Sequence, residues 1–181
     1  MGYPKGLLTV HNRPILEHIL QTARWDGPTL LVTSPGRESP PGADQFDDEV
    51  VDPVAGLGPM RGVLTALESA KTETVIVAPV DMPSITAEVF QWLAHEMQTR
   101  ETALAVLLER IKDGAAELEP MPSAFRKSAR ELLIQRLAME KRSLRGLNGS
   151  DGVEVLQAPR NWSPAIWQNL NYPHDLTFPI S

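Results

Sequence analysis

The sequence contains no cysteine, and this absence excludes several kinds of chemistry. Without a thiol the chain forms no disulfide, binds no zinc or iron–sulfur cluster through thiolates, and uses no cysteine nucleophile. Long apolar runs are lacking too, since no stretch approaches the roughly 18 residues that a membrane span needs. The N-terminus does not have the charged-then-apolar layout of a signal peptide. We therefore expect a cytoplasmic protein without a membrane segment.

Basic residues are too few to make the chain cationic. The 17 Lys and Arg residues are outnumbered by 23 Asp and Glu residues, which gives a formal net charge of −6. Proteins that bind nucleic acid usually present a basic face, so we expect no nucleic-acid partner. An anionic ligand would instead need a local cation or a metal. With 181 residues, 42% of them hydrophobic, the chain is expected to form a single domain over residues 1–181.

Histidine pairs at the spacing of metal ligands are also absent. We expect ordinary surface or partly buried positions for the four histidines, His11, His18, His95 and His174. The tryptophans are expected to pack in the core or at its edge, because a large apolar ring is used most often in that way. They are Trp25, Trp92, Trp162 and Trp167.

Apolar residues occur alternately at helical spacing and in short runs along the chain. Helical spacing predicts helices over residues 14–24, 59–70, 86–99 and 127–140. Short apolar runs predict strands at residues 29–33, 50–51, 74–78 and 153–155, whereas the run at 102–108 fits a strand or a helix extension. Residues 34–48, rich in Pro, Gly, Ser and acids, predict a loop. This alternation predicts an α/β fold of three layers, with a mainly parallel, Rossmann-like sheet and helices on both faces.

Ligands bind at the carboxyl ends of the strands in such a sheet, so the residues there are of most interest: Thr33, Asp52 and Asp81. Asp81 comes after an apolar run and begins an Asp-Met-Pro turn. Its carboxylate is a natural Mg²⁺ ligand, because Mg²⁺ prefers hard oxygen and is usually held by one or two carboxylates plus substrate phosphates. The local sequence allows equally that Asp81 caps the next helix.

A glycine-rich segment follows Asp52 and leads into a predicted helix. Gly58 and Gly62 would let backbone N–H groups approach a ligand closely, and a helix that starts near Pro59 would favour negative charge at its N-terminus. Gly62 is followed by Val63 rather than by Lys and Ser or Thr, so the segment is not a Walker A loop. Considered alone, it is more often only a turn.

Lys5 lies just ahead of an apolar pair near the start of the sequence. A lysine can act as a point charge on phosphate, but most surface lysines are simply solvated. The lysine alone therefore does not indicate a function.

Together these segments resemble, in order and spacing, the family of MobA-like molybdenum cofactor guanylyltransferases. That family shows a start reading Leu-Ala-Gly-Gly-x-Ser-x-Arg-Met-Gly-x-Asp-Lys, a Gly-Pro-Leu-x-Gly loop, a Cys-Asp-Met-Pro-like strand end and an Asn-x-Asn-x-Pro-x-Asp/Glu-Leu finish. The similar segments here are residues 1–5, 58–62, 81–83 and 169–176, and residues 119–126 resemble the stretch before the family's late helix. The resemblance covers essentially the whole chain.

The resemblance implies an enzyme that transfers GMP from GTP to molybdopterin, with Mg²⁺ as its cofactor. By this analogy Asp81 holds the metal and serves catalysis together with Lys5, which also meets the nucleotide phosphates. The nucleotide-binding residues would be Lys5, Asp52, Gly58, Pro59 and Gly62. Asn169 and Asn171 would lie on the molybdopterin side. GTP and molybdopterin are the implied partners, along with contact to other proteins of molybdenum cofactor synthesis.

The sequence departs from the family at its start, where the first strand and the glycine-rich phosphate loop are absent. Loss of a central strand would leave its neighbours with unpaired edges. Because Met1 coincides with the family's internal Met-Gly, we expect an N-terminally truncated domain whose natural reading frame begins further upstream. A degenerate, non-catalytic homologue is the alternative.

Three further departures concern the nucleotide. Pro4 stands where the family usually has an aspartate, and Thr33 follows the second strand at a position that can contact the nucleotide. These two weaken the assignment of GTP, so a nucleotidyltransferase that uses CTP or a sugar phosphate stays an alternative. Arg61 replaces a small residue of the family loop and is either a new phosphate contact or a solvated helix residue. We favour the solvated residue, because exposed arginines are common.

Overall fold

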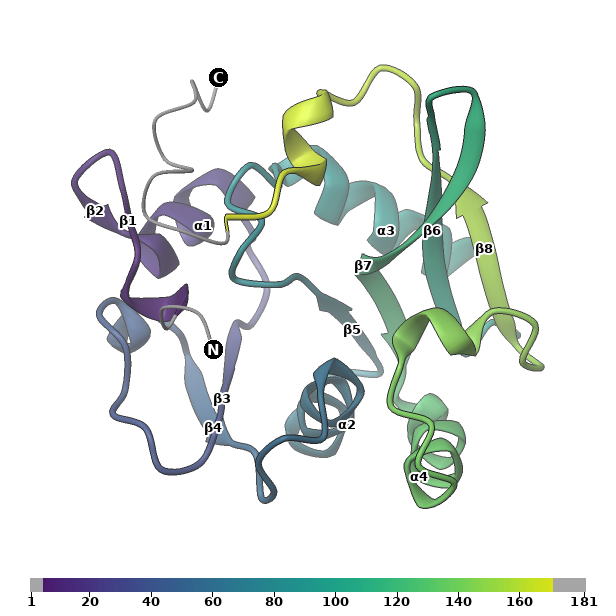
Figure 1. Cartoon of the computed structure of the whole chain (residues 1–181), viewed down its shortest axis with the longest axis horizontal. Helices are drawn as coiled ribbons and strands as arrows, with labels where there is room; N and C mark the ends of the chain where they lie inside the picture. The colour runs from purple at the N-terminus through teal and green to yellow at the C-terminus, as the bar shows by residue number, and fades with distance from the viewer. Residues whose placement is uncertain (1–4, 171–181) are drawn as a thin grey trace.

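Three groups of β-strands and four α-helices make up residues 5–170, the part of the chain that the computed structural model describes (Figure 1). The strands are β1 (Thr9–Val10), β2 (Arg13–Pro14), β3 (Leu30–Thr33), β4 (Asp48–Val51), β5 (Thr74–Val77), β6 (Ala105–Lys112), β7 (Ala115–Arg126) and β8 (Val153–Gln157). The helices are α1 (Ile15–Ala23), α2 (Pro59–Ser69), α3 (Ala87–Thr99) and α4 (Arg130–Ala138). Short 3-10 segments are η1 (Lys5–Leu7), η2 (Ala43–Gln45), η3 (Lys127–Ala129), η4 (Leu144–Leu147) and η5 (Pro164–Trp167).

The helices lie where the apolar spacing predicts them, and local residues set their ends. Pro59 is the first residue of α2, where its ring fixes a helical φ and its missing N–H costs no hydrogen bond. Gly58 precedes it with a φ of 75°, a conformation that favours glycine. The late helix starts with the 3-10 segment η3 and continues as α4. No helix within residues 5–170 is long and apolar enough to cross a membrane.

The larger sheet has the strand order β5-β7-β6-β8. Strand β7 is antiparallel to both β5 and β6, whereas β6 and β8 are parallel, so β5, β6 and β8 run in one direction and β7 is reversed. The mainly parallel α/β fold is therefore confirmed. The ambiguous run at residues 102–108 contributes to strand β6 and does not extend a helix. Strand β7 was not predicted from the sequence.

The strands β3 and β4 form a separate parallel pair, set apart from the larger sheet (Figure 1). The carbonyl of Thr33 accepts a hydrogen bond from the N–H of Asp52, on the side of β3 that faces β4. Strand β5 pairs with β7, and just before β5 the carbonyl of Glu73 accepts a hydrogen bond from the backbone N–H of Lys127. Within residues 5–170, β3 and β5 each have a ladder partner on one side.

Alternate residues of the central strands belong to two apolar cores, one on each face of the sheet. Val106 and Leu108 of β6 pack with residues of α3, while Ala105 and Leu107 pack with residues of α2 and α4. Successive side chains of a strand point to opposite faces, so this division follows directly from the strand geometry. The helices α2 and α4 therefore cover one face and α3 the other, which confirms the three layers. A third core joins α1 with β3.

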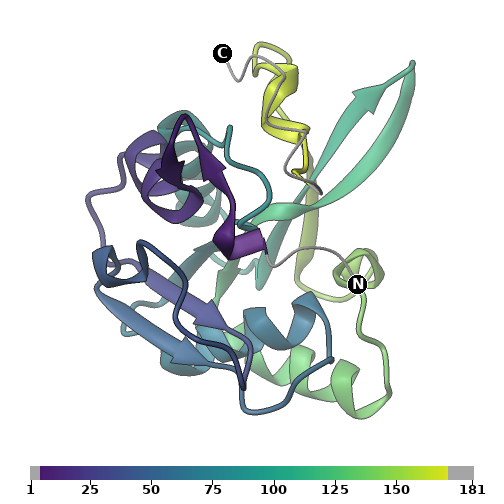
Figure 2. The ribbon, with the colours of Figure 1, turned by 60° about the vertical axis from the view of Figure 1, so that its left-hand side comes forward.

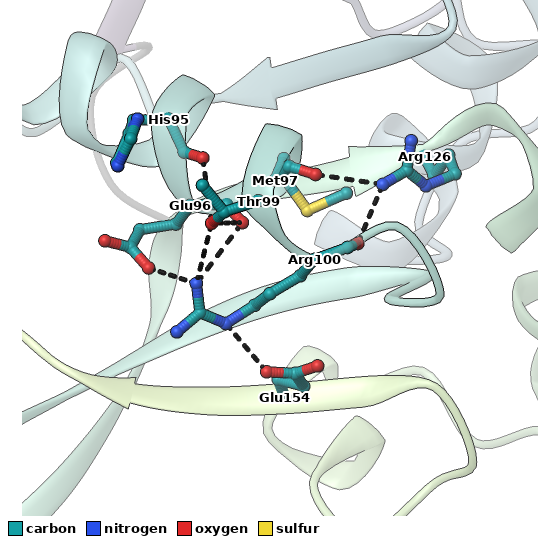
Figure 3. Close-up of polar contacts among 7 residues, drawn as sticks. All are labelled: His95, Glu96, Met97, Thr99, Arg100, Arg126 and Glu154. Atoms are coloured by element: carbon teal, nitrogen blue, oxygen red, sulfur yellow. Dashed lines mark hydrogen bonds and ion pairs between the residues drawn. The ribbon is translucent and has the colours of Figure 1, made fainter.

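Arginine side chains tie the end of α3 to the sheet (Figure 3). The guanidinium of Arg126 donates to the carbonyls of Met97 and Arg100, both at 2.9 Å, and to that of Ala103 at 3.0 Å. The last carbonyls of a helix have no partner within the helix, so these bonds satisfy groups that would otherwise be orphaned. Arg100 in turn donates through Nε to Glu154 on β8 at 2.8 Å.

The hairpin of β6 and β7 projects beyond the body of the molecule (Figure 2). Toward its turn, the guanidinium of Arg110 on β6 lies 5.4 Å from the ring centre of Trp167. Trp167 packs against the buried Trp162, which meets Trp92 edge to face at 5.4 Å between ring centres. Trp25 is 38% exposed, at the edge of the fold. The expectation that the tryptophans pack in or beside the core is confirmed.

Candidate active site

Asp81 lies in the turn between β5 and α3. Strand β5 ends at Val77, so Asp81 does not follow the strand directly as expected; three residues separate the two. The cap residue of α3 is Thr86, so the alternative that Asp81 caps this helix is wrong. The side chain of Asp81 is 17% exposed, which leaves it accessible at the carboxyl end of the strand.

The ammonium group of Lys5 forms an ion pair with Oδ2 of Asp81. The lysine comes from η1, 76 residues away in the sequence, and its side chain is 41% exposed. An ion pair that is partly shielded from water is stronger than one on the open surface. The structure thus brings together the two residues that the resemblance names as catalytic.

The segment before the C-terminal end also reaches this turn. The backbone N–H of Leu170 donates to the carbonyl of Asp81 at 2.7 Å, and Leu170 is buried in the third core. The neighbouring Asn169 is exposed, so its amide is available beside the turn. Asn171, predicted with Asn169 to bind molybdopterin, lies outside the described residues.

The other predicted nucleotide-binding residues form a second group around the start of α2. Asp52 directly follows β4, and its Oδ2 would stand 3.9 Å from a Cβ added at Gly62. Its Oδ1 is buried and has no hydrogen-bond partner among residues 5–170. A buried carboxylate oxygen without a partner is costly, so this atom is suited to accept a hydrogen bond from a ligand or water.

A cavity of about 420 Å³ opens beside this group. Its lining includes Gly56, Gly58 and Pro59 from the glycine-rich segment and Pro120 and Met121 from β7. The remaining lining residues follow α4 and lead into η4: Arg142, Ser143, Leu144 and Arg145. The predicted glycine-rich loop therefore borders a hollow large enough for part of a nucleotide.

The two arginines of this cavity were not predicted as site residues. Arg145 donates to the carbonyl of Leu118 and lies 3.6 Å from Glu119 Oε2, which anchors it to β7. Arginine binds phosphate through a planar fork of N–H groups, and the N-terminus of α2 favours an anion as well. In the sequence, a cluster of basic residues after α4 is the only sign of these arginines, and such a cluster is equally typical of a solvated surface.

Arg61 is not the solvated helix residue that we expected from the sequence. Its guanidinium donates to Thr65 Oγ1 at 2.9 and 3.1 Å and pairs with Glu68, one and two turns further along α2. The arginine side chain is only 12% exposed. Its charge is thus satisfied within α2, because residues at these spacings share one face of a helix.

Thr33, the other residue that bears on nucleotide choice, is the last residue of β3. Its hydroxyl donates to Glu49 Oε1 on the neighbouring strand at 3.3 Å. This contact occupies the hydroxyl proton, although the oxygen can still accept.

Residues 1–153 match the sequence model of the MobA-like NTP transferase domain. The chain belongs to this family. Its members are nucleotidyltransferases, so the chain is an enzyme of that kind by descent, and the resemblance seen in the motifs is confirmed.

Named relatives of this MobA-like chain extend over nearly its whole length. A probable molybdenum cofactor guanylyltransferase of Nostoc sp. is 28% identical, over 97% of this chain and 82% of the relative. A molybdenum cofactor guanylyltransferase of Pasteurella multocida is also 28% identical, over 97% of this chain and 89% of the relative.

Solved structures show the same fold as this MobA-like chain. The molybdopterin-guanine dinucleotide biosynthesis protein A of Archaeoglobus fulgidus superposes with a TM-score of 0.74 at 18% identity, covering 95% of this chain and 86% of that one. The 2-C-methyl-D-erythritol 4-phosphate cytidylyltransferase of Thermus thermophilus gives a TM-score of 0.62 at 19% identity, covering 97% and 96%. The shared fold thus includes proteins named for different nucleotides.

The residues around Asp81 can be compared with what Mg²⁺ requires. No group of three or more His, Cys, Asp or Glu side chains that could enclose a metal occurs among residues 5–170. Asp81 offers one hard carboxylate, and that carboxylate already accepts a cation, the ammonium of Lys5. This donor chemistry fits Mg²⁺ in the MobA-like chain, because one or two carboxylates usually suffice when phosphates and water complete the coordination.

Proposed function

We propose that this MobA-like protein transfers GMP from GTP to molybdopterin and releases pyrophosphate. The names of its relatives support this reaction, and the pairing of Lys5 with Asp81 carries the structural argument. That pair sets a cation and a partly buried carboxylate side by side in the turn after β5, the charges that a phosphate group with its metal requires. We also propose that residues 1–181 form one domain that acts in the cytoplasm.

The proposed reaction needs positioning and charge stabilisation rather than a protein nucleophile. An oxygen of the terminal phosphate of molybdopterin attacks the α-phosphorus of GTP, and the bond from that phosphorus to the leaving pyrophosphate breaks. Bound Mg²⁺ would supply neutralisation of charge on the phosphates. Asp81 would hold the metal, and Lys5 would meet the nucleotide phosphates. Asn169 and Asn171 are proposed to contact molybdopterin.

The glycine-rich group would bind the rest of the nucleotide. Gly58 and Pro59 bring backbone to the edge of the cavity, and Arg142 adds a cation there, while Gly62 lies beside Asp52. Asp52 Oδ1, buried without a partner, would accept a hydrogen bond from a hydroxyl or N–H group of the nucleoside. These assignments rest on the second group of residues, so they can be tested separately from Asp81.

Each of two alternative functions is supported by one observation. The fold shared with a cytidylyltransferase supports a nucleotidyltransferase that acts on CTP or a sugar phosphate. The separation of the β3–β4 pair from the larger sheet supports a non-catalytic member of the family. Base choice between GTP and CTP depends on contacts that Thr33 and its surroundings would make.

The deciding experiment is to incubate the protein with molybdopterin, Mg²⁺ and either GTP or CTP and to separate the dinucleotide product by chromatography. Guanine dinucleotide is expected, and it should disappear in Asp81→Asn while the free energy of unfolding changes by no more than about 1 kcal/mol, as for a partly exposed ion pair. The matched control is Asp48→Asn, which removes an exposed carboxylate paired with Lys71. A product from CTP alone would reassign the nucleotide.

Isothermal titration with GTP and CTP separates a lost activity from a lost site. A protein that binds neither nucleotide in the presence of Mg²⁺ would leave the non-catalytic alternative as the better one. A protein that binds GTP but makes no product would retain the proposed nucleotide site without the transfer.

A further inference from the structure

Lys5 and Asp81 are both attached to the third core through hydrogen bonds that their backbone carbonyls accept. The N–H of Leu8 donates to the carbonyl of Lys5 at 3.1 Å. The N–H of Leu170 donates to the carbonyl of Asp81 at 2.7 Å. Leu8 and Leu170 are 3% and 4% exposed, and both belong to the core that joins α1 with β3. The two partners of the ion pair are therefore fixed by buried leucines of the same core.

The turn around Asp81 is held less firmly from within. The N–H of Met82 lies 3.3 Å from the carbonyl of Pro79, which is beyond the usual range for such bonds. This bond contributes less than the 2.7 Å bond from Leu170, because hydrogen bonds weaken as they lengthen. Val80, just before Asp81, also packs against the third core. The course of the turn thus depends more on the segment that carries Leu170 than on its own backbone bond.

The segment that carries Leu170 is anchored in two different cores. Ile166, in the preceding 3-10 segment η5, is 2% exposed and belongs to the core under α3. Leu170 belongs to the third core, and the exposed Asn169 lies between the two anchors. Because side chains in a close-packed core have little freedom, the stretch between the anchors passes beside Asp81 along a fixed course.

We propose that Leu170 is a positioning residue, which holds the Asp81 carboxylate beside Lys5. Its side chain anchors the segment in the third core, and its N–H holds the carbonyl of Asp81. Such positioning matters for group transfer, since a misplacement of about 1 Å can lower a rate about a hundredfold. Leu170 also ties the turn to Asn169, the proposed contact to molybdopterin. Only the effect on turnover rests on the proposed function.

A zero-length carbodiimide cross-link between Lys5 and Asp81 measures their contact in the ligand-free protein. The reagent joins a carboxylate to an amine only where the two touch, and mass spectrometry quantifies the joined peptides. Replacement of the Leu170 amide by an ester removes the N–H and keeps the leucine side chain. We expect the cross-link yield to fall about three- to tenfold in the ester protein, the factor for the loss of one hydrogen bond. An unchanged yield would overturn the proposal.

Leu170→Ala removes the apolar anchor and keeps the N–H. The cross-link yield should fall here too, and Leu170→Met, which has a similar volume, should restore it. Leu31→Ala is the matched control, because Leu31 on β3 is 6% exposed and belongs to the same core. It should lower the overall stability without a loss of the cross-link. Equal losses in Leu170→Ala and Leu31→Ala would mean that the general stability of the third core positions Asp81, and would overturn the role of Leu170.

The rate of dinucleotide formation from GTP and molybdopterin tests the consequence for the reaction. In the ester protein kcat should fall about tenfold or more, because the carboxylate is displaced, while the affinity for GTP should change little. Leu31→Ala should keep the wild-type kcat. No product from the wild type would count against the proposed function, while the cross-link would still decide the role of Leu170. A wild-type kcat in the ester protein would overturn the link to catalysis.

Discussion

The ammonium group of Lys5 contacts the carboxylate of Asp81, so the cation and the acid of the proposed active site neutralise each other. A metal ion that binds Asp81 has to compete with this ammonium group, whereas a phosphate that binds Lys5 would draw it away. Nucleotide and metal should therefore assist each other at this pair, because each removes the other's competitor.

Replacement of the lysine tests this competition. Lys5→Met should tighten the binding of Mn²⁺ in the absence of nucleotide by a few-fold to about tenfold, since it removes a nearby positive charge. The same change should weaken GTP binding, because it also removes the proposed phosphate contact. Both affinities can be measured by isothermal titration.

The control is Lys71→Met, which removes the partner of Asp48 in an exposed ion pair. It alters the net charge by the same amount and should leave both affinities unchanged. If Lys5→Met did not change the affinity for Mn²⁺, the ammonium group would not compete with the metal.

Arg142 provides a separate test of the cavity beside α2. Arg142→Ala should weaken GTP binding by about tenfold, the loss expected for one charge-assisted hydrogen bond to phosphate. Lys141→Ala is the control, because Lys141 is exposed, adjacent and does not line the cavity. Equal losses in the two variants would indicate a general effect of charge rather than a contact in the cavity.

Helix α2 could be predicted from the sequence, whereas strand β7 could not. Pro59 and the apolar spacing after it located α2, because these signals are local. Strand β7 was missed because Pro120 and Pro122 argue against a strand, and because its first half is exposed or half-buried and only its second half enters the core.

The site was predictable where it follows a motif and unpredictable where it depends on tertiary contact. Lys5 and Asp81 were identified by family resemblance, and the structure brings them together. Arg142 reaches the cavity only through the packing of the segment after α4. His18 has no metal-ligand spacing, and its place beside His11, with ring centres 6.0 Å apart, depends on how α1 packs.

Arg126 is expected to be important for stability rather than for activity. Its guanidinium makes three hydrogen bonds to backbone carbonyls, two of them at the end of α3. Arg126→Ala should lower the free energy of unfolding by about 2 to 4 kcal/mol, because partly buried carbonyls lose a charged donor. Urea denaturation measures this, with the exposed Lys71→Ala as control. A loss below 1 kcal/mol, as for an ordinary surface residue, would mean that water replaces the arginine.

The lowered pKa of His18 predicts a loss of stability under mildly acidic conditions. Burial first, and then the charge of His11, lowers the pKa of His18 below its ordinary value of 6.5 in the folded state. The unfolded chain therefore binds the proton first as the pH falls through about 6.5, and stability decreases from there down to the folded pKa. His18→Gln should remove this part of the pH dependence, whereas His95→Gln, at an exposed position on α3, should not. Urea unfolding at pH 7.5, 6.5 and 5.5 compares the three proteins, and parallel curves for wild type and His18→Gln would show that His18 titrates alike in both states.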